Sequence, residues 1–293
     1  MKELPVTISR MLVPTLLLAT ACGGGADRSL IQNTGSDTML DVAQAWAERY
    51  QTVNPAVAIA VSGGGSGTGI AAMINGTVDL ANSSRPMTTE ELEAARANGN
   101  DPIEHIVGYD ALAVFLHPDN PISAMTLAQL AEIYAEGGTS NTWSDIGVSV
   151  PGCGSDEIVR VSRQNSSGTY AYFQEAVLAE REYKLGSRNM NGSSEVVDLV
   201  ENTPCAIGYS GLAYATEGVK MPCVSVSEGS ECIAPSVATA SDRSYPIARP
   251  LFMYTAGAAQ GALAEYLNWI TGDEGQCVLL DIGYAPYRDV TCS

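Results

Sequence analysis

Four segments of this chain share one design, in which small hydroxyl, amide or glycine residues directly follow a predicted strand or extended stretch. At least three of them also open a predicted helix. A repeated strand–turn–helix order is typical of α/β folds. In such folds ligands bind beyond the carboxyl ends of the strands, where turns of this kind gather. The four segments are residues 35–38, 62–69, 83–85 and 163–169. The sequence therefore predicts an α/β protein whose ligand site is assembled from these turns.

The segment at residues 163–169 shows the design most fully. It lies between a predicted strand at 157–161 and a helix whose apolar face begins at Tyr170. The first N–H groups of a helix lack intrahelical partners, and the helix dipole is positive there. An anion at this place would meet N–H donors, hydroxyls and the guanidinium of Arg163. The alternative is a simple helix cap at Ser166 or Ser167 beside a surface arginine.

The glycine-rich segment at residues 62–69 matches no catalytic or nucleotide-binding motif. The Rossmann pattern finds no register in it, and a P-loop requires Lys where Ile70 stands. A nucleophile elbow requires Gly where Thr68 stands. What remains is a turn in which glycine lets the backbone approach a ligand closely.

The residue types in the four segments predict binding without chemistry. They offer hydroxyls, N–H groups and two guanidinia, Arg85 and Arg163, but few carboxylates and no histidine. His105 and His117 lack a plausible Ser or Cys partner, and no C-x-x-C pair is present. We therefore expect no catalysis, no metal and no cofactor, and a small, multiply charged oxyanion as the ligand. A net charge of −18 makes nucleic acid an unexpected partner. That charge does not oppose a local anion site, because exposed charges are mostly screened beyond about 8 Å.

The N-terminus is predicted to be an export signal. Lys2 and Arg10 flank an apolar run at 11–19 that is too short to span a bilayer. Small residues then precede Cys22, and a glycine tract follows it. This order resembles a bacterial lipoprotein signal, with residues 1–22 as the signal peptide, Cys22 lipidated and residues 23–29 as a tether. Ordinary signal cleavage nearby is the alternative.

The six remaining cysteines predict three disulfides, because an even number in an exported protein indicates a disulfide framework. Six cysteines allow 15 pairings. We favour Cys223–Cys232 and Cys277–Cys292, which close short local loops, and this leaves Cys153–Cys205.

Several runs together resemble the phosphate-binding proteins of phosphate ABC importers. The resemblance covers roughly residues 30 to 285, with the runs in the family's order. The runs are Gly-Ser-Asp-Thr-Met at 35–39, Gly-Gly-Ser-Gly-Thr-Gly at 64–69, Val-Asp-Leu-Ala-Asn-Ser-Ser-Arg at 78–85, Arg163 with Ser-Gly-Thr at 167–169, Ala-Ile-Gly-Tyr at 206–209 and Tyr-Pro-Ile-Ala-Arg-Pro-Leu at 245–251.

The resemblance implies a type II periplasmic-binding-protein fold with the ligand in a cleft between two α/β lobes. Lobe one is expected at residues 30–111 and 246–293, and lobe two at 112–245. The implied function is capture of inorganic phosphate by a monomeric, lipid-anchored protein and delivery to the permease of an ABC importer. The alternatives are another tetrahedral oxyanion (sulfate, arsenate or molybdate), a phosphate sensor on the same fold, and a phosphatase-like enzyme, for which the sequence shows neither a metal cluster nor an activated nucleophile.

Carried over by position, the expected phosphate contacts are Ser36, Asp37, Thr38, Ser66, Gly67, Ser84, Arg85, Arg163, Ser167, Gly168 and Thr169. The chain departs from better-known members at Ser84, where they have an Asp that accepts the proton of hydrogen phosphate and helps to exclude sulfate. We therefore expect Asp37 or Asp110 to take that role. Arg85 would add a second cation or pair with Asp110.

Overall fold

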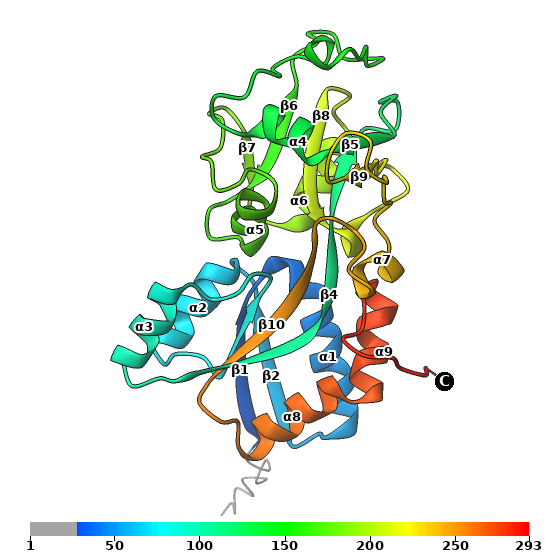
Figure 1. Ribbon diagram of the computed structural model, residues 1–293. Coiled ribbons are helices and arrows are strands. Elements are labelled where there is room, and N and C mark those ends of the chain that lie inside the picture. The colour runs from blue at the N-terminus through cyan, green and yellow to red at the C-terminus, as the bar shows by residue number, and fades with distance from the viewer. Residues whose placement is uncertain (1–27, 293) are drawn as a thin grey trace, which may run out of the picture.

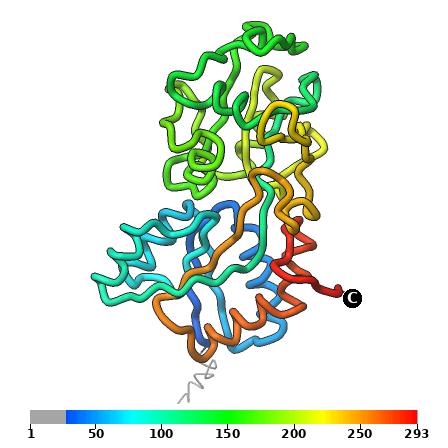
Figure 2. The backbone as a smooth tube through the Cα atoms, in the orientation of Figure 1, coloured from blue at the N-terminus to red at the C-terminus, as the bar shows by residue number. Residues whose placement is uncertain are grey.

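The computed structural model describes residues 28–292, which form two lobes joined by two long strands (Figures 1 and 2). The joining strands are β4 (Pro102–Leu116) and β10 (Ala248–Ala256). The predicted α/β class and two-lobed arrangement are confirmed. The predicted signal peptide and Cys22 lie outside the described residues. Residues 23–27 of the predicted tether also lie outside the described residues, and β1 begins at Ser29.

One sheet of eight strands runs through both lobes in the order β2-β1-β3-β10-β4-β8-β6-β7. Its long strand β4 changes partner along its length. Up to Ala111 it pairs antiparallel with β10, and from Leu112 onward it pairs with β8. The central strand therefore hydrogen-bonds to both lobes.

The lobe that holds the N-terminal elements has helices packed against β1, β2, β3 and the lower part of β4 and β10 (Figure 1). In its core Trp46 and Tyr50 pack with Tyr266 and Ile270. The elements are β1 (Ser29–Gly35), η1 (Asp37–Met39), α1 (Leu40–Val53), β2 (Val57–Ser62), α2 (Ser66–Ile74), β3 (Leu80–Ser83), α3 (Thr89–Ala97), α8 (Gly261–Thr271) and α9 (Asp273–Ile282).

The other lobe surrounds a core of stacked aromatic rings. Phe173 and Tyr209 stack with their ring centroids 3.8 Å apart, and Tyr134 meets both rings edge-on. Its elements are β5 (Ala124–Thr126), α4 (Leu127–Tyr134), η2 (Ser144–Ile146), β6 (Val159–Arg163), α5 (Gly168–Ala176), β7 (Arg188–Met190), α6 (Ser193–Glu201), β8 (Ala206–Gly211), η3 (Leu212–Tyr214), β9 (Cys223–Ser225) and α7 (Val237–Ser241). The aromatic stack holds α5 against the sheet. The start of α5 is the place where the sequence predicts an anion site.

The three predicted disulfides are confirmed. Cys153–Cys205, Cys223–Cys232 and Cys277–Cys292 are all bonded, with sequence separations of 52, 9 and 15 residues. The first bond joins the loop before β6 to the residue before β8. These two strands pair in parallel within the sheet of the second lobe.

Removing the disulfide that closes the longest loop, Cys153–Cys205, should destabilise the protein more than removing the one that closes the shortest loop, Cys223–Cys232. A cross-link stabilises mainly by restricting the unfolded chain, and the effect grows with loop length. We expect replacement of Cys153 and Cys205 by Ala to lower the free energy of unfolding by about 2 to 4 kcal/mol. The matched replacement of Cys223 and Cys232 should cost less. Urea denaturation without reductant measures both, and equal losses would contradict the dependence on loop length.

Candidate functional site

Residues 163–169 lie at the edge of the second lobe that faces the first. β6 ends at Arg163, and α5 begins at Gly168 with Ser167 as its N-cap. The Ser167 hydroxyl accepts a hydrogen bond of 3.2 Å from the N–H of Thr169. The predicted cap at Ser167 is therefore present, and it coexists with the anion-binding geometry of the helix start.

The first lobe contributes three of the predicted turns to the same place. Thr38 lies on the short helix η1, Ser66 is the first residue of α2, and Ser84 directly follows β3. Ser84 donates its N–H to the Ser66 hydroxyl at 3.0 Å, and the two hydroxyl oxygens are 3.4 Å apart. All three side chains are buried. The structure therefore gathers hydroxyls from separate turns into one small volume.

The donors of the two lobes lie directly against each other. The hydroxyls of Thr38 and Thr169 are 2.8 Å apart. Gly67 donates its N–H to the carbonyl of Ser166 at 2.9 Å, and the Ser166 hydroxyl donates to the carbonyl of Gly64. Residues 99 to 131 positions apart in sequence thus meet across the junction of the lobes.

Two glycines permit this close approach. Gly65 has a φ of +97°, and a Cβ there would lie 2.5 Å from the carbonyl oxygen of Ser166. A Cβ on Gly168 would overlap the hydroxyls of Ser66 and Ser84. Side chains at these positions would hold the lobes apart, so glycine is required for the backbone to reach the site.

Arg163 is fully buried and held from several sides. Its guanidinium donates to the hydroxyl of Ser193 and to the carbonyl of Asn191, each at 2.8 Å, and lies 3.3 Å from a carboxylate oxygen of Asp37. Its Nε has no hydrogen-bond partner among the residues that the structure describes. Burial lowers the pKa of Arg163, and Asp37 opposes that effect. The site thus contains a fixed cation with an unsatisfied buried donor, as binding of an anion requires.

The two candidate proton acceptors differ in how many of their lone pairs are used. Asp110 is completely buried, accepts two hydrogen bonds from Arg249 on one oxygen, and accepts the N–H of Leu212 on the other. Burial raises the pKa of Asp110, and Arg249 and Leu212 oppose that effect. Asp37 accepts one N–H from Gly64 and the long contact from Arg163, and its side chain is 13% exposed. Asp37 therefore has fewer hydrogen-bond partners than Asp110 and more unused acceptor capacity.

Arg249 is a residue at the centre of the site that the sequence reasoning missed. Its guanidinium contacts Thr38, Thr169 and the carbonyl of Ser84, which belong to three of the four predicted segments. A signal was present in the sequence. Arg249 interrupts an otherwise apolar strand, and a charge in a buried strand requires a buried partner.

The predicted role of Arg85 is wrong in its pairing. Its guanidinium forms two hydrogen bonds of 2.7 Å with the carboxylate of Glu91 at the start of α3, and Asp110 pairs with Arg249 instead. Glu91 is already fixed beside Arg85, because it closes the capping box of α3 with Thr88. Both carboxylate oxygens of Glu91, six residues along the chain, accept from Arg85, while Asp110 is already paired with Arg249. The Arg85 guanidinium therefore contacts Glu91 and the carbonyl of Pro86, and none of the other predicted phosphate contacts, all of which lie within the described residues.

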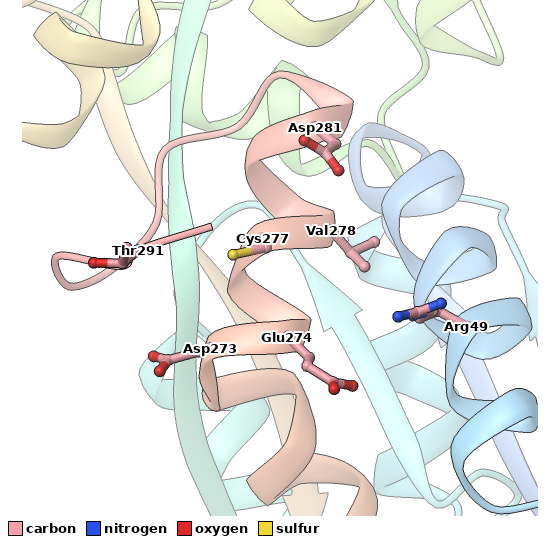
Figure 3. A pocket seen from close by; sticks show the side chains of 7 residues that line it. All are labelled: Arg49, Asp273, Glu274, Cys277, Val278, Asp281 and Thr291. Carbon is pink, nitrogen blue, oxygen red and sulfur yellow. The ribbon is translucent and has the colours of Figure 1, made fainter. Parts of the chain in front are cut away.

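A separate hollow of about 400 Å³ lies on the outer face of the first lobe, between α1 and α9 (Figure 3). Carboxylates dominate its lining, with Asp273, Glu274 and Asp281 against the single cation Arg49. Like charges would repel an anion there, so this hollow is no alternative to the junction site. Among residues 28–292 no group of three or more His, Cys, Asp or Glu side chains is arranged to hold a metal ion.

Known proteins that resemble this chain in sequence or in fold include periplasmic binding proteins and phosphate-binding proteins. A model of the PBP superfamily domain matches residues 20–274. The phosphate-binding protein PstS of Pseudomonas aeruginosa is 33% identical over 268 residues, which are 87% of this chain and 82% of that protein. PstS of Bacillus subtilis is 28% identical over 99% of this chain and 96% of that protein. A Clostridium perfringens structure described as a phosphate ABC transporter substrate-binding protein with bound phosphate has a TM-score of 0.77 and 27% identity, covering 89% of this chain and all of that chain.

Two α/β lobes joined by long strands, with hydrogen-bond donors facing each other at the junction, define the class of periplasmic binding proteins. The matched superfamily domain is that class. Within it, the chain belongs to the family of phosphate-binding proteins of phosphate ABC importers. The family consists of transport components rather than enzymes.

Proposed function

We propose that this protein captures inorganic phosphate between its two lobes and delivers it to the permease of an ABC importer. The observation that carries the proposal is the convergence of buried hydroxyls from both lobes at a junction that also holds two buried guanidinium groups, those of Arg163 and Arg249. Thr38 contacts Thr169 across the junction, and Ser66 contacts Ser84. Arg163 pairs with Asp37, the neighbour of Thr38. Each hydrogen bond to a charged ligand contributes about 1.5 to 3 kcal/mol.

We propose that the ligand contacts are the hydroxyls and N–H groups of the four turns together with Arg163. Asp37, rather than Asp110, accepts the proton of hydrogen phosphate, because Asp37 has fewer hydrogen-bond partners and its side chain is not fully enclosed. The proposed set is Ser36, Asp37, Thr38, Ser66, Gly67, Ser84, Arg163, Ser167, Gly168 and Thr169. Arg85 is omitted because Glu91 holds its guanidinium.

We propose lobe boundaries at residues 30–111 with 246–293 and at 112–245. The change of partner of β4 between Ala111 and Leu112 supports the first boundary. The second falls just before β10, at Ala248. Closure around phosphate is then a hinge motion of the two joining strands, and the closed form is the one that the permease recognises.

Titration calorimetry on residues 28–293 with phosphate, sulfate, arsenate and molybdate tests the function. We expect phosphate to bind in a one-to-one complex and sulfate to bind far more weakly. If sulfate or molybdate binds more tightly than phosphate, that anion is the ligand instead of phosphate. Failure of all four anions to bind would overturn the proposed function.

Replacing Asp37 by Asn should reduce the discrimination between phosphate and sulfate. An amide cannot match the carboxylate as acceptor for the ligand proton, so phosphate affinity should fall about 10- to 100-fold. Sulfate carries no proton at neutral pH, so its affinity should not fall in parallel. The control is Asp41→Asn, an equal charge change at an exposed position of α1. A parallel loss for both anions in Asp37→Asn would rule out Asp37 as the proton acceptor.

We further propose that a monomer is anchored outside the cytoplasm by a lipid on Cys22. The order of charges, apolar run and small residues before Cys22 supports this. Among residues 28–292 no helix is long and apolar enough to cross a membrane.

Expression of the full chain in a bacterial host with radioactive palmitate should label the wild type and not the Cys22→Ala variant. The lipid is attached only to the thiol of that cysteine, so its removal should release the protein from the membrane fraction. Equal labelling of both proteins would exclude Cys22 as the anchor, and labelling of neither would favour ordinary signal cleavage.

A further inference from the structure

The guanidinium of Arg249 joins three of the turns that form the proposed phosphate site. Nη2 lies 3.0 Å from the Thr169 hydroxyl and 3.4 Å from the Thr38 hydroxyl, and Nη1 lies 3.3 Å from the carbonyl of Ser84. Asp110 anchors the group from behind through Nε at 3.0 Å and Nη2 at 2.8 Å. Arg249 and Asp110 are each about 1% exposed.

The two threonines share one N–H of Arg249. Nη2 carries two hydrogens, and Asp110 takes one of them. The remaining hydrogen points to the oxygens of Thr38 and Thr169, which are 2.8 Å from each other. Both hydroxyl oxygens therefore accept from Arg249, and one of the two hydroxyls donates its proton to the other. The pair keeps one proton for donation to a ligand.

We propose, building on the proposed phosphate function, that Arg249 is a positioning residue that commits the hydrogen-bonded hydroxyl pair of Thr38 and Thr169 to donate its free proton to the ligand. Thr38 belongs to one lobe and Thr169 to the other, so a single buried guanidinium orients donors on both sides of the junction. Because Asp110 balances its charge, Arg249 orders the site without adding net charge to it. The threonine pair is thereby set as a donor. Asp37 is then the residue that accepts the proton of the ligand.

A double-mutant cycle on phosphate affinity tests this assignment. Removing Arg249 alone would leave Asp110 unpaired in the core, so the pair is replaced together as Asp110→Asn with Arg249→Met, which leaves the net charge unchanged. In the second arm Thr38→Val with Thr169→Val removes the two hydroxyls and keeps their shape. The third protein combines all four changes. Circular dichroism and thermal melts establish that each variant is folded.

We expect replacement of the pair to weaken phosphate binding about 10- to 100-fold when both threonines are present. It should have less than about a threefold effect when both are Val, since no hydroxyl is left to orient. An equal loss in both backgrounds would overturn the proposal, because Arg249 would then act through the scaffold alone. No loss in either background would overturn it as well.

The pH dependence of affinity gives a second readout that a purely structural role would not move. In the wild type, affinity should change across the second ionisation of phosphate, because the committed donors favour the more charged ion. In the Asp110→Asn, Arg249→Met variant the hydroxyls can also accept, so the dependence should flatten. An unchanged profile would count against the proposal. Absence of phosphate binding in the wild type would instead refute the proposed function, so the two failures are distinguishable.

Discussion

Replacing Arg163 by Met should weaken phosphate binding on the order of 10²- to 10³-fold. The side chain is fully buried at the junction, and its Nε is an unsatisfied donor among the described residues. Charge-assisted hydrogen bonds of this kind are each worth about 1.5 to 3 kcal/mol, and each 1.4 kcal/mol is a factor of ten in affinity. The variant also leaves Asp37 without its cation, which places a bare carboxylate beside the incoming anion. Titration calorimetry of the variant measures the loss.

The matched control for that experiment is Arg85→Met, which removes the same charge from a nearby turn. Because Arg85 pairs with Glu91, we expect phosphate affinity to stay within about threefold of the wild type. A loss as large as that of Arg163→Met would show that Arg85 leaves Glu91 and joins the site when phosphate binds. An unchanged affinity in Arg163→Met itself would remove the fixed cation from the proposed mechanism.

Replacing Arg249 alone by Met should lower the free energy of unfolding by about 3 to 5 kcal/mol. The change leaves Asp110 as an unpaired carboxylate in a fully buried position. A buried ion pair is not by itself strongly stabilising, but removal of one partner is costly because the remaining charge stays desolvated. Urea denaturation at neutral pH measures the cost.

The deficit of Arg249→Met should depend on pH in a defined direction. Burial raises the pKa of Asp110, and loss of the neighbouring cation raises it further. A folded pKa above the unfolded value of about 3.9 means that the folded state binds the extra proton between the two values. Stability from that protonation is fully present below about pH 4 and is lost as the pH rises through the folded pKa. The variant should therefore lie closest to the wild type in acid and furthest from it at neutral pH.

The control is the double replacement Asp110→Asn with Arg249→Met, which removes both charges. It should recover most of the lost stability, since replacing a whole buried ion pair is often close to neutral. A double variant as unstable as the single one would show that the cost comes from lost packing of the Arg249 side chain and not from the stranded carboxylate.

The local features of the site could be predicted from the sequence, because they depend on short-range physics. Helix starts, capping residues and glycine turns are encoded within a few positions. This is why α5 begins two residues before Tyr170, where its apolar face was expected, and why Ser167 is its cap. The local disulfides could also be chosen correctly, because cysteines that are close in sequence meet at little entropic cost.

Partners of buried charges could not be predicted from the sequence in the same way. Arg85 and Arg249 are both candidates to pair with the buried Asp110. Their local sequence does not show which of the two arginines lies next to Asp110 in the fold. The antiparallel register of β4 with β10 sets Asp110 directly opposite Arg249, 139 residues away. Arg85 lies on a turn that α3 covers with Glu91. Sheet register is a long-range property, so local patterns carry no record of it.

By itself the sequence determined which turns donate hydrogen bonds, because donor-rich helix starts follow from residue type and spacing. The tertiary structure alone decided that Arg249 lies among these turns, that Asp110 pairs with it, and that Asp37 has fewer hydrogen-bond partners than Asp110. The physical reason is that a charge can be buried only where the fold supplies its partner. That partner is fixed when two distant strands pair, after the local turns have already been specified.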